Sequence, residues 1–549
     1  MKKSIRQTAL VACTTLGLTL LTACCSGSSD EGIEASITAT PLGAATHHHD
    51  ETASRIRVPA HSGESEYVSF RRSDGVKIDL QLGLLNLVPI ELQSCGTTVG
   101  LLMQRFAREL SPIASAYAHG GDGGDAPEGA ISVVEGETTD LGALTARPGR
   151  YCGIVVELQP GQATPASDSG LDTSLEGAAI NVAPCYYATA AGLSDEAAAA
   201  VTTHSCIQAK YSGDKRRVTL PFTTPVTLDA ASRELAISIA VRYEEWFENV
   251  DFTKLATDAA EQARLADNVA GSLQALTGDE QLVNLAFKIA VNGEEAVCGQ
   301  VYDGLGNGAQ RDLRVEGFRY YASDFELENA AGTQPVRLAS KPNATVYQDD
   351  RHGVALLGQA QGCDAPAQVR NLSLAGAVKK DDYERLCFLL GVPFELGHSD
   401  PATAPSPLNV TGMDWSWLFG RMFFRFDSIV DPDGDAPANF FVHLGSTGCS
   451  NGSSDFGAAP SEECVFPNRP RICLDYAEIE EGHPIVADIA PMISEVDIGH
   501  NTEDTAPGCM SFTGDPECVT VIPKFGLDYQ LDPASLVPRR EQALFSVGE

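Results

Sequence analysis

A chain of 549 residues is longer than one hydrophobic core usually fills, so we expect two domains. Its 74 acidic residues outnumber 38 basic ones, giving a formal charge of −36, which repels nucleic acid and anionic membrane surfaces. The composition therefore argues against nucleic-acid binding. It suits cations or a basic protein partner, and a merely solubilising exterior explains it equally well.

The first 24 residues resemble a bacterial lipoprotein signal peptide. Three basic residues lie within the first six positions, an apolar run covers residues 16–21, and the sequence LTAC ends at Cys24. This pattern predicts lipidation of Cys24, and an ordinary secreted protein cut nearby is the alternative. No later apolar run reaches the roughly 18 residues that a membrane span needs. We therefore expect a lipoprotein of the bacterial cell envelope, in the outer membrane or facing the periplasm.

Cysteine usage agrees with export, because disulfides persist in oxidising compartments. Twelve cysteines remain once Cys13, Cys24 and Cys25 near the N-terminus are set aside. These disulfide candidates are Cys95, Cys152, Cys185, Cys206, Cys298, Cys363, Cys387, Cys449, Cys464, Cys473, Cys509 and Cys518.

Connectivity does not follow from sequence, but short separations favour three pairs. These are Cys185 with Cys206, Cys449 with Cys464, and Cys509 with Cys518. Oxidised cysteines are not thiolate ligands, so a metal site in the oxidised protein has to use other residues.

Residues 25–55 are rich in Ser, Thr, Ala and Gly with few large apolar residues, which predicts a flexible tether between lipid and fold. The run His47-His48-His49-Asp50 lies in this tether. Its imidazoles can capture Cu²⁺ or Zn²⁺, but ordering a mobile segment costs conformational entropy. A dedicated metal role for this run is therefore the weaker alternative.

Residues 56–280 are predicted to form an N-terminal β-sandwich domain. Short β-rich runs such as VKIDLQLGLLNLVPIEL, ARPGRYCGIVVEL and RELAISIAVRY are separated by Gly, Pro and Asp clusters. The Gly-rich acidic segment 118–130 predicts a solvated loop, with a cation site as the alternative. Residues 251–277 have helical apolar spacing and strong helix formers, which predicts one helix that closes this domain and links the halves.

Residues 281–495 return to alternating patterns, in LVNLAFKIAV, YASDFELEN and VALLGQAQGC, and predict a second β-sandwich. Residues 496–549 are polar and predict a C-terminal tail with a small disulfide loop between Cys509 and Cys518. The predicted fold class is therefore all-β, with two disulfide-stabilised β-sandwich domains joined by a helical segment.

Motifs of common enzyme classes are missing from the sequence. It contains no G-x-S-x-G, no G-x-x-x-x-G-K, no H-E-x-x-H and no C-x-x-C-H motif. The segment 431–435, DPDGD, resembles the start of a calcium loop, but the twelfth position holds Val442 instead of glutamate. A turn between two strands is the better interpretation. We expect a protein that is not an enzyme.

Two histidines lie in segments that otherwise look structured, His398 in ELGHSD and His443 in FFVHLGSTGC. Trp415 and Trp417 follow the first histidine, and strand alternation predicts that both indoles point the same way. Such histidines often only pack in a core, so a structural role is the alternative to metal ligation.

Several long motifs of the second half resemble the MbnP family. They include the segment LCFLLGVPFELGHSDPATAPSPLNVTGMDWSWLFGRMFFRFD, FFVHLGSTGC, CVFPNRPRICL and CGQVYDGLG. Members are called metallo-mystery-pair four-Cys-motif proteins and are related to the copper-binding proteins MopE and CorA. The resemblance extends from about Ala286 to Pro491.

This resemblance implies a periplasmic or surface copper-binding β-sandwich. It also implies a partner, a di-haem cytochrome c peroxidase of the MauG/MbnH type, which oxidises a tryptophan to kynurenine. By the same resemblance, His398, His443 and the modified Trp415 or Trp417 hold the copper. Apart from the resemblance, the position of Asp400 two residues past His398 makes it a candidate to orient an imidazole. The alternative is a structural or adhesive cell-surface β-protein without a metal site.

Overall fold

The fold is described from a computed structural model. It describes residues 33–42, 59–60, 63–64, 67–72, 76–95, 130–161, 171–187, 204–229, 231–297, 299–339, 341, 345–349, 351–359, 371–434, 437–453, 457–532 and 534–548. Cys24, the histidine run at 47–49 and most of the acidic loop at 118–130 lie outside these residues. Within the described residues, no helix is both long and apolar enough to cross a membrane.

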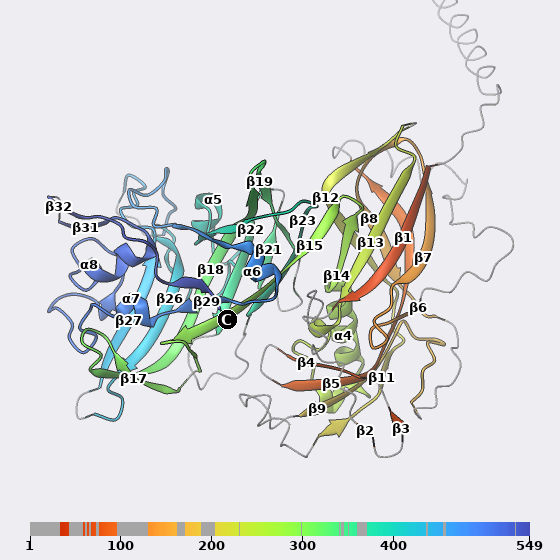
Figure 1. The fold of residues 1–549 in the computed structure, drawn as a ribbon, viewed down its shortest axis with the longest axis horizontal. Helices are drawn as coiled ribbons and strands as arrows, with labels where there is room; N and C mark the ends of the chain where they lie inside the picture. Colours follow the sequence, from red (N-terminus) through yellow and green to blue (C-terminus); the bar gives the residue numbers. More distant parts are fainter. Residues whose placement is uncertain are drawn as a thin grey trace, which may run out of the picture.

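Two sheets form the first half of the chain (Figure 1). The four-stranded sheet has the order β14 (Leu273–Thr277), β13 (Glu234–Arg242), β1 (Ile33–Leu42) and β7 (Thr139–Ala146). The eight-stranded sheet has the order β10 (Ser205–Cys206), β9 (Ile180–Tyr187), β5 (Lys77–Ser94), β8 (Gly149–Leu158) and β12 (Arg216–Leu228), with β4 (Val68–Arg71) and β6 (Ala130–Ser132) beside β5 and β11 (Ala209–Tyr211) beside β9. A separate pair joins β2 (Pro59–Ala60) to β3 (Gly63–Glu64).

One hydrophobic cluster joins these two sheets. Ile37 and Ile237 come from the four-stranded sheet, and Ile78 and Ile154 come from the eight-stranded one. All four side chains are at most 2% exposed. The alternation of apolar and polar residues that predicts strands therefore also selects the face that enters this core.

The predicted tether is wrong for residues 33–42, which form β1. This strand pairs in parallel with β13 and antiparallel with β7. Ala35, Ile37 and Ala39 point into the core while Ser36 lies exposed between them. Small alanines give the segment a linker-like composition, but they alternate with polar residues as in a strand, and their side chains lie on the core face of the sheet.

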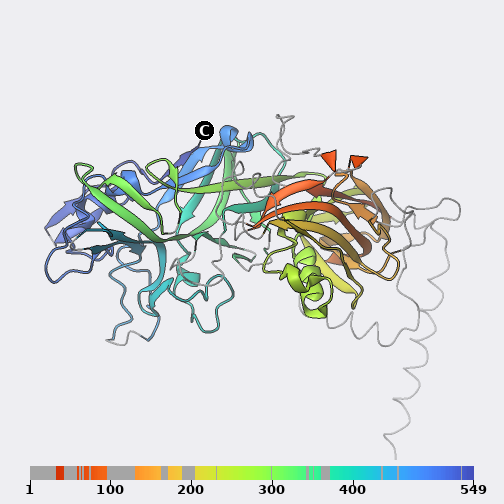
Figure 2. The same cartoon turned by 90° about the horizontal axis from the view of Figure 1, so that it is seen from below.

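The single helix predicted for residues 251–277 is also wrong in its extent. The segment contains α3 (Phe252–Leu255), α4 (Ala259–Gly271) and then β14, while η1 (Tyr243–Glu245) precedes it. Asp258 interrupts the helix because its carboxylate accepts from the backbone N–H groups of Ala260 and Glu261. After Gly271 the chain returns to the sheet beside β13, and α4 packs outside the sandwich (Figure 2).

Two further sheets form the second half. The six-stranded sheet has the order β20 (Arg337–Leu338), β23 (Ser373–Lys379), β15 (Glu280–Val291), β29 (Ile485–Asp488) and β33 (Phe545–Val547), with β16 (Glu294–Glu295) beside β15. The eleven-stranded sheet has the order β21 (Val346–Gln348), β22 (Gly353–Gln359), β18 (Arg311–Asn329), β26 (Gly420–Val430), β27 (Ala438–Gly445) and β30 (Gly508–Cys509), with β17 (Val301–Leu305), β19 (Gly332–Pro335) and β24 (Arg385–Leu390) beside β18, β28 (Arg471–Asp475) beside β24 and β25 (Asp414–Ser416) beside β26.

Short elements complete this half. They are α5 (Phe394–Gly397), α6 (Tyr476–Glu480), α7 (Ala490–Ile493), α8 (Cys518–Val521), η2 (Ile522–Phe525) and the strand pair β31 (Tyr529–Asp532) and β32 (Ser535–Val537). The fold is all-β, as predicted.

Aromatic residues of β18 and β26 fill the core of the second half. Phe318 makes edge-to-face contacts with Phe424 and Phe426, at centroid distances of 5.2 and 5.6 Å. Each such ring contributes roughly 1.5–3 kcal/mol through burial. The hydrophobic clusters of the described residues do not mix the two halves, since their members lie either before residue 277 or after residue 282.

The closing stretch is not a separate tail. Its strand β33 pairs with β29, and β30 pairs with β27. Phe525, Leu544 and Phe545 are nearly fully buried in the same core as β18. A polar average composition hides these few apolar residues, and their burial makes residues 496–548 part of the second half.

Five disulfides are present among the described residues. The three predicted pairs are confirmed, namely Cys185–Cys206, Cys449–Cys464 and Cys509–Cys518. Cys95–Cys152 and Cys387–Cys473 join positions 57 and 86 residues apart. Cys298 and Cys363 lie outside the described residues.

Candidate metal centre

The predicted ligands belong to the outer face of the eleven-stranded sheet. Phe440, Val442 and Leu444 of β27 point into the main core, so His443 points to the opposite face. Residues 391–419 cover that face and contribute Val392 and Leu408 to a second apolar cluster. In Figure 2, loops of this half extend from one side of the sandwich.

His443 is held by a buried carboxylate. Its Nε2 lies 2.7 Å from Oδ1 of Asp427, and Nε of Arg425 donates to Oδ2 of Asp427 over 2.7 Å. Burial alone would raise the pKa of Asp427, but the hydrogen bond from His443 and the charge of Arg425 outweigh it and lower that pKa. An ionised carboxylate only accepts hydrogen bonds, so Nε2 of His443 is the donor in this contact, and Nδ1 is the ring nitrogen left to bind a metal.

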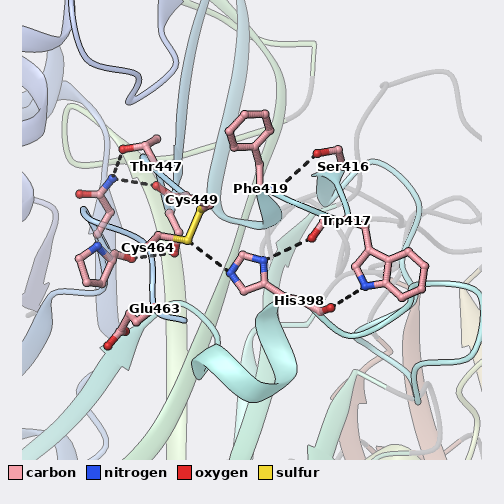
Figure 3. The surroundings of a disulfide bond; sticks show 12 residues. His398, Ser416, Trp417, Phe419, Thr447, Cys449, Glu463 and Cys464 are labelled. Carbon is pink, nitrogen blue, oxygen red and sulfur yellow. Dashed lines mark hydrogen bonds between the residues drawn. A yellow bond between two sulfur atoms is a disulfide. The ribbon is translucent and has the colours of Figure 1, made fainter. Parts of the chain in front are cut away.

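His398 follows α5 and is buried beside a disulfide (Figure 3). Its Nε2 lies 3.7 Å from Sγ of Cys464, and its Nδ1 lies 3.4 Å from the carbonyl oxygen of Trp417. Burial lowers the pKa of His398, and the nearby charges of Arg469 and Arg421 lower it further. The imidazole is therefore neutral at pH 7, the protonation state that a metal ligand needs.

Gly420 makes room for the His398 ring. Its φ of +73° favours glycine, and a Cβ at this position would lie 2.8 Å from Nδ1 of His398 and 2.7 Å from the carbonyl oxygen of Gly397. Arg421 fixes the same turn from below, because its Nη1 donates to the carbonyls of Leu396 and Gly397 over 2.6 and 3.0 Å.

The two indoles have different environments, which corrects the prediction that they point the same way. Strand β25 ends at Ser416, so alternation does not extend to Trp417. Nε1 of Trp417 donates to the carbonyl oxygen of His398 over 2.7 Å, and this residue is 37% exposed. Trp415 packs against Phe512 at a centroid distance of 5.1 Å and is half-buried.

The segment that contains His398 and the two indoles approaches the strand that contains His443 at one end of the β26–β27 pair. A Cβ on Gly445 would lie 2.6 Å from the six-membered ring of Trp415, so this indole covers the strand two residues beyond His443. Gly445 pairs with Met422, two residues after the Gly420 that contacts His398. Within the described chain, however, no group of three or more metal-ligating side chains contains His443.

Sequence reasoning missed the carboxylate of the site. Asp400, the predicted partner of an imidazole, instead accepts from the backbone N–H of Ala402 over 2.9 Å. The carboxylate that orients an imidazole is that of Asp427, and the imidazole is that of His443 and not of His398. Alternation along β26 predicts Arg425 and Asp427 on one face, but the register of the β26–β27 hairpin decides which of them meets His443.

Residues 431–434, which follow β26, form a turn, as predicted. Asp431 has a φ of +48°, and its carbonyl oxygen accepts from the N–H of Gly434 over 2.9 Å.

The described residues contain three groups in which metal-ligating side chains lie close to one another. Each group contains a disulfide. They are Cys185, His204 and Cys206; His398, Cys449 and Cys464; and Glu328, Cys387 and Cys473. With the sulfurs bonded to one another, none of these groups offers thiolates.

Comparison with known proteins agrees with the resemblance of the second half. Residues 280–511 match the model of the MbnP family. The structure is similar to that of MbnP from Methylosinus trichosporium, with 28% sequence identity and a TM-score of 0.40 over 49% of this chain and 98% of that chain. No curated protein matches this chain. The predicted resemblance is confirmed, and residues 280–511 contain a domain that matches the MbnP family.

Proposed function

We propose that this chain is a lipid-anchored copper-binding protein of the bacterial cell envelope and not an enzyme. The proposed ligands are His398, His443 and an oxidised Trp415. The observation that carries the proposal is the hydrogen bond between His443 and Asp427 in a domain that matches the MbnP family. A histidine that binds a metal commonly donates its second ring N–H to a carboxylate, as His443 does here.

The donor set suits copper. Both histidines are buried. Among the described residues, no hydrogen bond engages Nδ1 of His443, and the contacts of the His398 ring nitrogens with Trp417 and Cys464 are long, at 3.4 and 3.7 Å. Copper binds nitrogen ligands most tightly among the first-row divalent ions. An intact indole cannot ligate through nitrogen, but ring opening to kynurenine exposes an amine.

Trp415 is the better of the two candidates for oxidation. Its ring lies over Gly445, on the strand that carries His443. The Trp417 ring is anchored through Nε1 to a backbone carbonyl and is partly exposed. The proposed oxidant is a di-haem peroxidase partner, and Cys24 is the proposed lipidation site.

Equilibrium dialysis against copper tests the site. We expect His398→Ala and His443→Ala each to lower the bound copper strongly. His352→Ala is the matched control, because Nδ1 of His352 also contacts a carboxylate, at 2.9 Å from Asp324, in the same half of the chain. Equal copper in all four proteins would contradict the proposal.

The alternative is a structural or adhesive β-protein. It is favoured by one observation, namely that both histidines already have partners within the chain. The same dialysis separates the two functions, because a structural role predicts no copper at either histidine.

A further inference from the structure

The contact between His398 and the Cys449–Cys464 disulfide has no role in the proposed copper site. The ligand atoms of these three residues lie within 4.8 Å of one another. Figure 3 shows the imidazole pointing its Nε2 toward the sulfur of Cys464, over 3.7 Å. Imidazole and thiolate together form a soft donor set, but the thiolates exist only when the disulfide is reduced.

We propose that Cys449, Cys464 and His398 form a latent metal site that opens on reduction and binds a soft cation such as Cu⁺. The site would use two thiolates and one imidazole, whereas the proposed copper site of the oxidised protein uses His443 and no sulfur. Both sites contain His398, so reduction would redirect that imidazole from one set of ligands to the other.

Among the described residues, the two cysteines of this disulfide differ in exposure. Cys464 is 4% exposed, whereas Cys449 is half-buried between the exposed Gly448 and Ser450. Small reductants therefore reach the sulfur of Cys449 first. On the opposite side, the His398 ring contacts Sγ of Cys464, so the imidazole lies next to the sulfur that reduction releases.

A dithiol is the reductant that the step needs. Its thiolate attacks Sγ of Cys449, the bond between the two cysteine sulfurs breaks, and the electron pair leaves on Sγ of Cys464. The second thiol of the reductant then displaces Cys449, so that the reductant ends as a disulfide and both cysteines end as thiols. A bound Cu⁺ replaces the two thiol protons.

The surrounding charges fit such a site. A Cu⁺ ion with two thiolates and a neutral imidazole carries a net negative charge. The guanidinium groups of Arg469 and Arg421 lie close enough to His398 to affect its charge. Nη1 of Arg469 donates to the carbonyl oxygen of Val392 over 3.2 Å, but its guanidinium also pairs with the carboxylate of Glu463. Arg421 donates to backbone carbonyls, so it is the cation that offsets the negative charge of the site.

The other two clusters are less suited to a soft ion. Glu328 beside Cys387–Cys473 is a hard oxygen ligand and already pairs with Arg385 and Arg471. His204 beside Cys185–Cys206 offers the same donors as the proposed site, but His204 and Cys206 are exposed to water. The group of Cys185, His204 and Cys206 therefore provides a matched control with identical ligand types.

Differential alkylation of the full-length protein tests the proposal without any variant. The folded protein is reduced mildly with a dithiol, freed of the reductant without oxygen, and treated with iodoacetamide with or without Cu⁺. We expect Cys449 and Cys464 to become alkylated without copper and protected with it, while Cys185 and Cys206 stay reactive. Equal alkylation of Cys449 and Cys464 in both samples, or their resistance to reduction in the folded protein, would overturn the proposal.

Metal stoichiometry gives a second test. The reduced wild-type protein should bind one more Co²⁺ ion than the reduced double variant Cys449→Ser/Cys464→Ser. That extra ion should show a thiolate-to-metal charge-transfer band. The double variant Cys185→Ser/Cys206→Ser should bind as many ions as the wild type. The variant His443→Ala should lose copper binding in the oxidised state but keep the reduction-dependent ion. Failure of the latent site and failure of the proposed function are thus distinguishable.

Discussion

Asp427→Asn is the substitution that most sharply probes how the chain prepares His443. The amide has the same shape but no charge, and it replaces one of two acceptor oxygens by a donor. In the wild type those oxygens accept from Nε2 of His443 and Nε of Arg425, both over 2.7 Å, and the bond from His443 is buried. The variant therefore loses at least one charge-assisted hydrogen bond, and we expect a loss of about 1.5–3 kcal/mol of unfolding free energy.

The loss of copper affinity in Asp427→Asn should be larger than its loss of stability suggests. Without the carboxylate, neither the ring orientation nor the tautomer of His443 is fixed, and loss of such a partner typically lowers metal affinity roughly 10–100-fold. Competition with a chromophoric copper chelator measures the affinity, and urea unfolding measures the stability. The control is Asp324→Asn, which removes the corresponding carboxylate from His352 and should leave copper binding unchanged. Wild-type copper affinity in Asp427→Asn would refute the reasoning.

Three further predictions concern His398 and the indoles. Gly420→Ala should destabilise the fold by about 1–3 kcal/mol and weaken copper binding, because its Cβ would clash with His398. The control is Gly452→Ala, where φ is +74° and nothing lies within 4 Å of a Cβ. In urea unfolding, this control should show only the free-energy cost of the left-handed backbone conformation. Trp415→Phe should abolish the ring-opened, oxygenated product in the mass spectrum of protein matured by its partner, and Trp417→Phe should keep it. The lowered pKa of His398 means that the unfolded chain takes up a proton near pH 6.5 and the folded chain does so only at lower pH. Stability should therefore fall as pH decreases below about 6.5, and less so in His398→Ala, which urea titrations at several pH values will show.

The strands were predictable because burial on one face imposes a period of two. At the end of this pattern in β26, Phe424 and Phe426 enter the main core while Arg425 and Asp427 lie on the opposite face of the sheet. The same pattern was overlooked in β1, where Ala35 and Ala39 are too small to look like core residues.

Contacts that depend on register or on loop packing were harder to predict. Nearby cysteines such as Cys509 and Cys518 pair as their spacing suggests, whereas the Cys387–Cys473 bond follows from the pairing of β24 with β28. The partner of His443 depends on the register of one hairpin. The contact of His398 with Cys464 depends on how two loops pack, and no local pattern in the sequence encodes it.

Residues 280–511 match the MbnP family, but the use of His398 and His443 together is the central claim. Anomalous diffraction at the copper edge, from crystals of oxidised, copper-loaded protein, tests it most directly. We predict one strong peak at bonding distance from Nδ1 of His443 and a ring nitrogen of His398, beside residue 415. A peak bound to other residues, such as the histidine run at 47–49, with none at His443, would contradict the account.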